Sequence, residues 1–339
     1  MRPSRSDSLI RTPVWILALV FLPGPALADQ VASSTASRKT RSYVIDEETT
    51  YVFEKPGPFD FAGAVPKDIQ TYVRDSFRRE NYLKLGGMMA LTAVLVYYDQ
   101  TITDETQKFG RRIHISNEDR TTEFFRVAGL PIRLPTDTGS ALYFLGDGWT
   151  QVGVTAAFFG TGLVRDDPRA LRTASQMAEG IVTVGILTQF LKHVTGRESP
   201  YVSTSRGGRW VPFPDQIEYH KHVARYDAYP SGHVATAMVA FTIMSENYPE
   251  QRWIKPLSWL WISGLSFQMV NNGVHWISDY PLSLAIGYSI GKLAVSRGRK
   301  VVKSQRAGGS GRRESPGSCG WEPAADAGMG LGLRFRCAF

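Results

Sequence analysis

The stretch Tyr-Pro-Ser-Gly-His at residues 229–233 stands directly before an apolar run of helical composition. Pro230 disfavours helix at the residue before it, and Ser231 is a good N-cap because its hydroxyl accepts from a first-turn N–H. Gly232 lets an anion approach the backbone closely. The N–H groups and dipole of a first helical turn attract phosphate-like anions, and His233 adds an imidazole beside them. Taken alone, the stretch fits a phosphate site or an ordinary capped helix.

A second cluster follows a long apolar helix candidate at residues 169–195. The chain from residue 192 to residue 200 is Lys-His-Val-Thr-Gly-Arg-Glu-Ser-Pro. Lys192 closes the predicted helix, Gly196 ends it, and Arg197 follows in the loop. Both cations are suited to phosphate oxygens.

A third cluster, Gly-Val-His-Trp-Ile-Ser-Asp, occupies residues 273–279. His275 and Asp279 are four residues apart and can meet on one helical turn. A carboxylate on one imidazole nitrogen fixes the tautomer and makes the other nitrogen more nucleophilic. The pair therefore predicts an activated histidine.

Together the clusters predict phosphoryl transfer through a phosphohistidine, with no metal or other cofactor. His275 attacks phosphorus, and His233 protonates the leaving oxygen. Cations and helix-start groups hold the equatorial oxygens, where transition-state charge develops. The predicted phosphate-binding residues are Lys192, Arg197, Ser231 and Gly232.

The order and spacing of these motifs resemble the type 2 phosphatidic acid phosphatase/vanadium haloperoxidase superfamily. The family pattern is Lys, six residues, Arg-Pro; then Pro-Ser-Gly-His; then Ser-Arg, five residues, His, three residues, Asp. The match extends over residues 171–294. The resemblance implies an all-α helical bundle and metal-independent phosphatase chemistry. It also implies His275 as nucleophile, His233 as acid and base, and Asp279 as the residue that orients the nucleophile.

Two arginines of the family pattern are missing. Ser199 replaces the arginine of the first motif, and Met269, preceded by Gln268, replaces that of the third. Arg197 lies in the same loop as Ser199 and is expected to substitute for one of them. Three explanations stay open: a less charged substrate, compensation by loop cations, or weak catalysis. The loop cations are Arg206, Arg209, Lys221 and Arg225.

Three functions compete on this pattern. The leading one is an exported acid-phosphatase-like hydrolase of a phosphomonoester or diphosphate, including lipid-linked ones. The alternative is a catalytically weak or inactive family member that binds an anionic lipid or a partner, which the missing arginines favour. Vanadate-dependent halide oxidation is the third, and it needs the same arginines to hold its oxyanion.

The chain of 339 residues is 43% hydrophobic, which allows a sizeable core. Helical spacing predicts an all-α bundle of six to seven helices without a central sheet. Pro66 is expected in a first turn, residues 99–140 as a polar excursion, and residues 141–164 as one helix. The predicted parts are a signal peptide (1–28), a linker (29–64), a helical domain (65–297) and a basic flexible tail with a terminal strand (298–339).

The N-terminus has the pattern of a secretory signal. Arginines precede the short apolar run at residues 14–22, and Ala-Leu-Ala at residues 26–28 fits a cleavage site. We therefore expect export to a periplasm. Short apolar runs with internal polar residues favour a soluble or peripherally membrane-associated bundle over membrane spans, although insertion stays open.

The formal net charge of +8 does not indicate nucleic-acid binding, because the basic run at residues 297–313 lacks interleaved aromatic residues. The expected partners are a phosphorylated small molecule or lipid and a membrane surface. His220 and His222 are two residues apart without a third ligand nearby, so no metal site is predicted. Cys319 and Cys337 allow a disulfide in an oxidising compartment.

Overall fold

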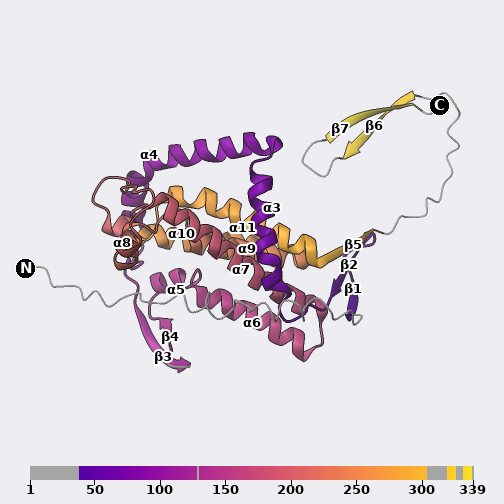
Figure 1. The fold of residues 1–339 in the computed structure, drawn as a ribbon, viewed down its shortest axis with the longest axis horizontal. Helices are drawn as coiled ribbons and strands as arrows, with labels where there is room; N and C mark the ends of the chain where they lie inside the picture. Colours follow the sequence, from indigo (N-terminus) through magenta and orange to yellow (C-terminus); the bar gives the residue numbers. More distant parts are fainter. Residues whose placement is uncertain (1–37, 128–129, 304–318, 326–330, 338–339) are drawn as a thin grey trace, which may run out of the picture. The chain divides into compact units, whose positions relative to one another are not determined.

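The computed structural model describes residues 38–127, 130–303, 319–325 and 331–337, so the predicted signal peptide lies outside it. These residues contain two short α-helices, α5 (Thr138–Phe144) and α8 (Gln216–Lys221), and seven long ones. The long helices are α3 (Asp60–Ser76), α4 (Tyr82–Arg112), α6 (Gly148–Val164), α7 (Pro168–Thr195), α9 (Gly232–Asn247), α10 (Ile254–Asn271) and α11 (Tyr280–Gly298) (Figure 1). The predicted all-α bundle of six to seven helices is confirmed.

The core forms around α9, whose apolar side chains pack against α7, α10 and α11. One buried cluster joins α7, α9 and α11 through Val184, Val239 and Ile290. A second joins α9 to α10 through Val234 and Leu265. The packing of α9 on α11 is tight, since a Cβ on Gly287 would lie 2.4 Å from the carbonyl oxygen of Ala235. The packing of α9 against three helices fixes the position of its first turn, which carries His233.

Three predicted helix boundaries were wrong. Pro66 lies inside α3, which begins at Asp60. Residues 141–164 form two helices, because the Asp147 side chain accepts from Trp149 N at 2.8 Å and caps the start of α6. The polar stretch after residue 98 continues α4 as far as Arg112, with Asp99 buried. Tertiary contacts of Asp99 therefore outweigh the polarity of this segment.

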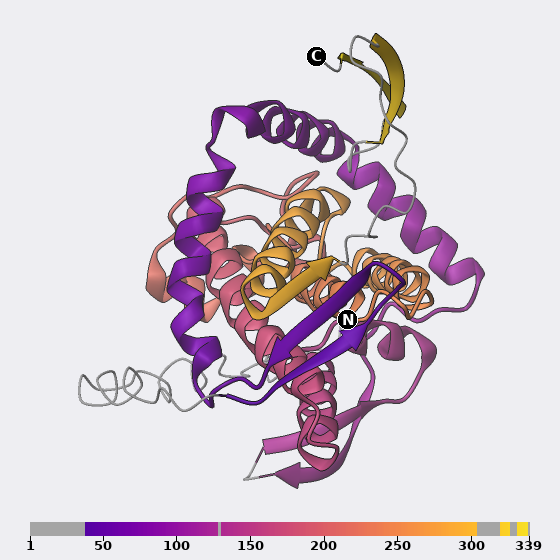
Figure 2. The ribbon, with the colours of Figure 1, turned by 90° about the vertical axis from the view of Figure 1, so that its right-hand side faces the viewer.

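The strands of the described residues form three small sheets. Strands β1 (Thr40–Val44), β2 (Thr49–Glu54) and β5 (Arg299–Lys303) form one antiparallel sheet in the order β1-β2-β5 (Figure 2). Strands β3 (Thr121–Val127) and β4 (Leu130–Pro135) pair as a hairpin, as do β6 (Cys319–Ala325) and β7 (Leu331–Cys337). The register of the last pair sets Cys319 opposite Cys337.

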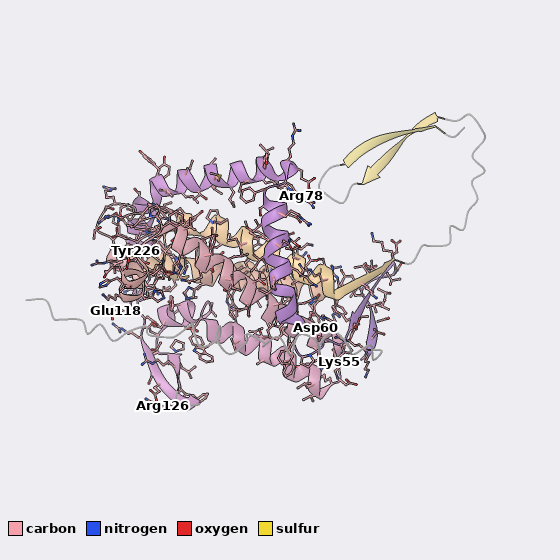
Figure 3. All side chains as sticks on the ribbon, viewed as in Figure 1. Lys55, Asp60, Arg78, Glu118, Arg126 and Tyr226 are labelled. Carbon is pink, nitrogen blue, oxygen red and sulfur yellow. The ribbon has the colours of Figure 1, made fainter. Side chains whose placement is uncertain are left out.

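The loops that carry the three motifs gather at one end of the bundle. Tyr226, in the loop before α9, and Glu118, before β3, lie toward this end, whereas Asp60 lies toward the other (Figure 3). Within the described part of the chain, no helix combines the length and the apolarity that a membrane crossing requires.

Candidate active site

A chain reversal after α7 separates Lys192 from Arg197. Gly196 has a positive φ of 55°, and its N–H donates to Lys192 O at 2.8 Å. A Cβ on Gly196 would lie 1.9 Å from Val211 O, so only glycine fits this turn. Because the chain reverses between them, Lys192 and Arg197 contact different acidic residues.

The start of α9 has the capping geometry that the sequence predicts. The Ser231 hydroxyl accepts from Val234 N at 3.4 Å, and Ser231 N donates to Asp279 O at 3.2 Å. The next first-turn N–H groups, those of Gly232 and His233, have no acceptor within a helix. A Cβ on Gly232 would lie 3.9 Å from Lys192 Nζ, so the ammonium group stands beside this helix start.

The two candidate catalytic histidines face each other across this end of the bundle. Their ring centroids are 6.1 Å apart. His275 Nδ1 lies 3.2 Å from Asp279 Oδ2, which also accepts from Trp276 N at 2.8 Å. The Tyr143 ring lies 5.6 Å from the His233 ring. The structure thus brings together the histidine pair and the orienting carboxylate that the motifs predict.

His233 is neutral in the ligand-free site at neutral pH. Burial, followed by the electrostatic influence of His275 and Lys192, lowers the pKa of His233 to about 3. A phosphate bound beside Lys192 would offset the charge of this lysine and raise that pKa. A bound anion would therefore favour the protonated form of this imidazole.

Lys192 has an acidic partner that the sequence did not reveal. Lys192 Nζ lies 3.0 Å from Asp227 Oδ1. The Tyr219 hydroxyl donates to the same carboxylate at 2.8 Å and accepts from Gln189 Nε2 at 2.8 Å. These contacts fix the lysine, but they also offset part of its charge.

Arg197 is predicted to bind phosphate, and its surroundings in the structure count against that role. Its side chain is completely buried, and its terminal nitrogens lie 2.6 Å from both Asp279 Oδ1 and Asp99 Oδ2. Both terminal nitrogens are thus bound to carboxylates of the protein. Arg197 cannot replace the missing arginine of the first motif without breaking this pair of contacts.

Neither substituted motif position supplies a cation. The Ser199 N–H donates to Ala224 O at 2.8 Å. The Met269 side chain is fully buried in the apolar cluster of α9 and α10. Its carbonyl oxygen accepts from Val274 N at 2.9 Å and from His275 N at 3.2 Å. Met269 therefore holds the backbone of the candidate nucleophile while its side chain fills the core.

Three residues that contact the site belong to no motif: Asp99, Tyr143 and Asp227. A sequence signal existed only for Asp99, a lone carboxylate at the end of the apolar run 83–98. The loop cations Arg206, Arg209, Lys221 and Arg225 are exposed. Among the side chains that the structure describes, no group of three or more His, Cys, Asp or Glu residues is arranged to hold a metal ion.

Residues 173–302 match the family model described as the PAP2 superfamily. This segment belongs to the PAP2 superfamily. It contains all three motif clusters, from Lys192 through His233 to Asp279, and confirms the family resemblance predicted from their spacing. Asp99 and Tyr143 lie outside it, so the PAP2 segment receives part of its site from the preceding helices.

No curated protein matches the chain. Two solved structures are similar. LpxE of Aquifex aeolicus is 19% identical, with 47% of this chain and 83% of that chain covered and a TM-score of 0.35. A transmembrane PAP2-type phosphatidylglycerolphosphate phosphatase from Bacillus subtilis is 13% identical, with 62% and 94% covered and a TM-score of 0.38. At these TM-scores, the assignment rests on the family match.

Proposed function

We propose that the protein is an exported phosphatase that hydrolyses a phosphomonoester or a diphosphate through a phosphohistidine on His275. The observation that carries this proposal is the His275–Asp279 pair facing His233 at the start of α9. A carboxylate on Nδ1 keeps the proton there and leaves Nε2 with a free lone pair. The helix start and Lys192 supply a place for the phosphoryl oxygens.

The reaction has two displacements at phosphorus. In the first, His275 Nε2 forms a bond to phosphorus while the bond to the leaving oxygen breaks, and His233 gives that oxygen a proton. In the second, His233 takes a proton from water, whose oxygen attacks phosphorus and releases His275. Lys192 and the N–H groups of Gly232 and His233 stabilise the equatorial oxygens in both steps.

The proton that His233 donates has to arrive with the substrate. Because the pKa of His233 is about 3 in the free site, this imidazole carries no proton at neutral pH. A monoanionic phosphate ester brings one proton and adds negative charge near Lys192, which favours transfer to His233. The expected substrate form is therefore the monoanion, and we expect higher turnover at mildly acidic pH than at neutral pH.

A lipid-linked substrate is favoured by the apolar surface of several helices. On α4, the side chains of Leu83 and Tyr97 are more than three-quarters exposed, at 88% and 81%. On α10, Leu260 is 72% exposed, beside Trp259 at 56%. Large exposed apolar areas are typical of surfaces that contact a membrane or an apolar ligand. We include a membrane-associated location in the proposal for this reason.

A second candidate function is anion binding without efficient turnover. Ser199 and Met269 remove two cations of the family motif, and Lys192 is paired with Asp227. Each charge-stabilising donor of this kind contributes about 10²-fold to turnover or more. This candidate predicts binding of an anionic lipid with negligible release of phosphate.

The deciding experiment measures phosphate release without added metal from a panel of phosphomonoesters and lipid diphosphates. We expect release by the wild type, trapping of an acid-labile phosphoenzyme, and loss of both in His275→Ala. His220→Ala is the matched control, since His220 is exposed and outside the site. Normal turnover in His275→Ala would contradict the mechanism. Lipid binding without phosphate release from any substrate would support the second candidate.

A further inference from the structure

Arg197 forms a buried connection between α4 and the candidate nucleophile. One terminal nitrogen, Nη1, donates to Asp279 Oδ1 at 2.6 Å and to Ser278 Oγ at 2.6 Å. The other, Nη2, donates to Asp99 Oδ2 at 2.6 Å and to Gly207 O at 2.9 Å. The guanidinium group thus holds two carboxylates at once, one on each side.

Asp99 is anchored as firmly as the arginine it binds. Its two oxygens accept from Ser278 N at 3.1 Å and from Ser278 Oγ at 2.6 Å. Ser278 immediately precedes Asp279 in the 3₁₀ turn η4 (Ile277–Asp279). Asp99 therefore fixes this turn directly through Ser278 and indirectly through Arg197.

The two oxygens of Asp279 have separate tasks in this arrangement. Oδ1 accepts from Arg197, whereas Oδ2 accepts from Trp276 N and lies against His275 Nδ1. With Oδ1 occupied, the carboxylate cannot rotate without breaking a charge-assisted hydrogen bond. Oδ2 is thereby kept on the imidazole.

Two indole rings hold the guanidinium plane in place. The Arg197 guanidinium carbon lies 4.6 Å from the Trp210 ring centroid and 5.3 Å from that of Trp276. Trp276 is itself fixed, because its Nε1 donates to Glu198 O at 2.8 Å. A planar fork fits this space and reaches both acids, whereas a lysine ammonium group is a single point charge.

The geometry points to Arg197 and Asp99 as positioning residues that act through Asp279 to hold His275 in its attacking orientation. This inference rests on the proposed function of His275. Arg197 lies two residues before Ser199, the substituted motif position, but it contacts the carboxylate of Asp279 instead of binding the phosphate. Asp99 balances its charge from a helix that precedes the PAP2 segment.

The test is a double-mutant cycle on turnover with Asp99→Asn, Asp279→Asn and the double variant. Asp99→Asn keeps the size of the side chain but removes its charge. We expect about a tenfold fall in kcat with KM changed less than about twofold, and no further fall when Asp279 is already asparagine. Asp68→Asn, which changes a buried carboxylate far from the histidines in sequence, is the control and keeps wild-type turnover.

If Asp99 only stabilises the fold, the same double-mutant cycle gives a different result. Loss of stability by Asp99→Asn would lower activity by the same factor in both backgrounds, and that result would overturn the inference. If Asp99→Asn does not fold, Ser278→Ala leaves all three charges in place. We then expect a smaller fall in kcat, again absent in the Asp279→Asn background.

A spectroscopic readout separates this inference from the proposed reaction. The proton on His275 Nδ1 should give a downfield resonance, assigned by its loss in His275→Gln, that moves in Asp99→Asn and in Arg197→Lys. Such a shift in a protein that hydrolyses no substrate would leave the positioning role intact and reject the phosphatase. An unchanged resonance in both variants would reject the positioning role even if turnover is normal.

Discussion

In the described residues, two clusters each join two buried carboxylates to one arginine, and the two arginines differ in their burial and in their distances from the acids. In the nucleophile cluster (Asp99, Arg197 and Asp279), the guanidinium group is fully buried and lies 2.6 Å from each carboxylate. In the α3 cluster (Asp68, Glu179 and Arg297), the arginine side chain is 32% exposed and lies 3.8 Å from Glu179 Oε1. It approaches Asp68 much more closely.

The difference in contact bears on the pKa values of Glu179 and Asp99. Burial, then a hydrogen bond to Asp68 and the charge of that residue, raises the pKa of Glu179 to about 9. Glu179 thus holds a proton at neutral pH. Burial also raises the pKa of Asp99, but Arg197 and Ser278 act in the opposite direction. The close guanidinium group favours the charged form of Asp99 against the effect of burial. At Glu179, whose arginine lies 3.8 Å away, burial and the neighbouring acid favour the protonated form instead.

The largest difference between the two clusters is expected in turnover, when one carboxylate of each cluster is replaced by an amide. Asp279→Asn should reduce kcat by about 10³-fold or more, because an amide facing His275 favours the wrong tautomer. Asp68→Asn, the matching change in the α3 cluster, should leave kcat unchanged. Steady-state kinetics of both variants on one substrate measure the difference. Equal losses in the two variants would show that the nucleophile cluster has no special role.

Removal of the arginine should lower the free energy of unfolding more in the nucleophile cluster than in the α3 cluster. Arg197→Met leaves two buried carboxylates without their cation, and we expect the free energy of unfolding to fall by about 3–5 kcal/mol. Arg297→Met should cost less, about 1–2 kcal/mol, because its side chain is partly exposed and the protonated Glu179 still hydrogen-bonds to the buried Asp68. Urea unfolding at pH 7 gives both values. Similar losses would contradict the contrast.

The proton held by Glu179 predicts that the free energy of unfolding falls as pH rises. Its folded pKa, about 9, lies above its ordinary value of 4.5. As pH rises through this range, the unfolded chain releases the proton while the folded chain retains it, so folding is progressively disfavoured. Glu179→Gln cannot titrate and should be more stable than the wild type at pH 8, by about 2 kcal/mol. Unfolding curves from pH 5 to pH 9 test this, and a parallel pH dependence in both proteins would refute it.

The half-buried base His233 should give the smallest effect. Its folded pKa, about 3, lies below its ordinary value of 6.5. As pH falls from 6.5 toward 3, the unfolded chain binds a proton that the folded chain refuses, so stability is lost. Because the side chain is partly exposed, we expect a loss of only about 1 kcal/mol between pH 7 and pH 5. His233→Gln should lack this contribution, and thermal melts at the two pH values compare the proteins.

The helix positions were mostly predictable, whereas several boundaries were not. Apolar spacing located all seven long helices because helical periodicity is a local property of the chain. The break before α6 and the extension of α4 depend on single contacts, the cap at Asp147 and the burial of Asp99. Local periodicity carries no information on such contacts.

The sequence by itself determined the fold class and the likeness of residues 173–302 to the PAP2 superfamily. It also determined the meeting of His275 with Asp279, which lie one turn apart, and the capped helix start that carries His233. These features depend on residue types at short, fixed spacings. The catalytic roles proposed for these residues stay predictions until variants are measured.

Only the tertiary structure decided the partners of the cations. Asp99 and Arg197 are 98 positions apart, and no local spacing predicts that they meet. The pairing of Lys192 with Asp227 depends likewise on the loop folding back over the end of α7. A buried cation needs an acid in contact with it, and which acid is nearest is settled by packing. Thus Arg197, which the motif predicts to bind phosphate, instead contacts the carboxylate that faces the candidate nucleophile His275.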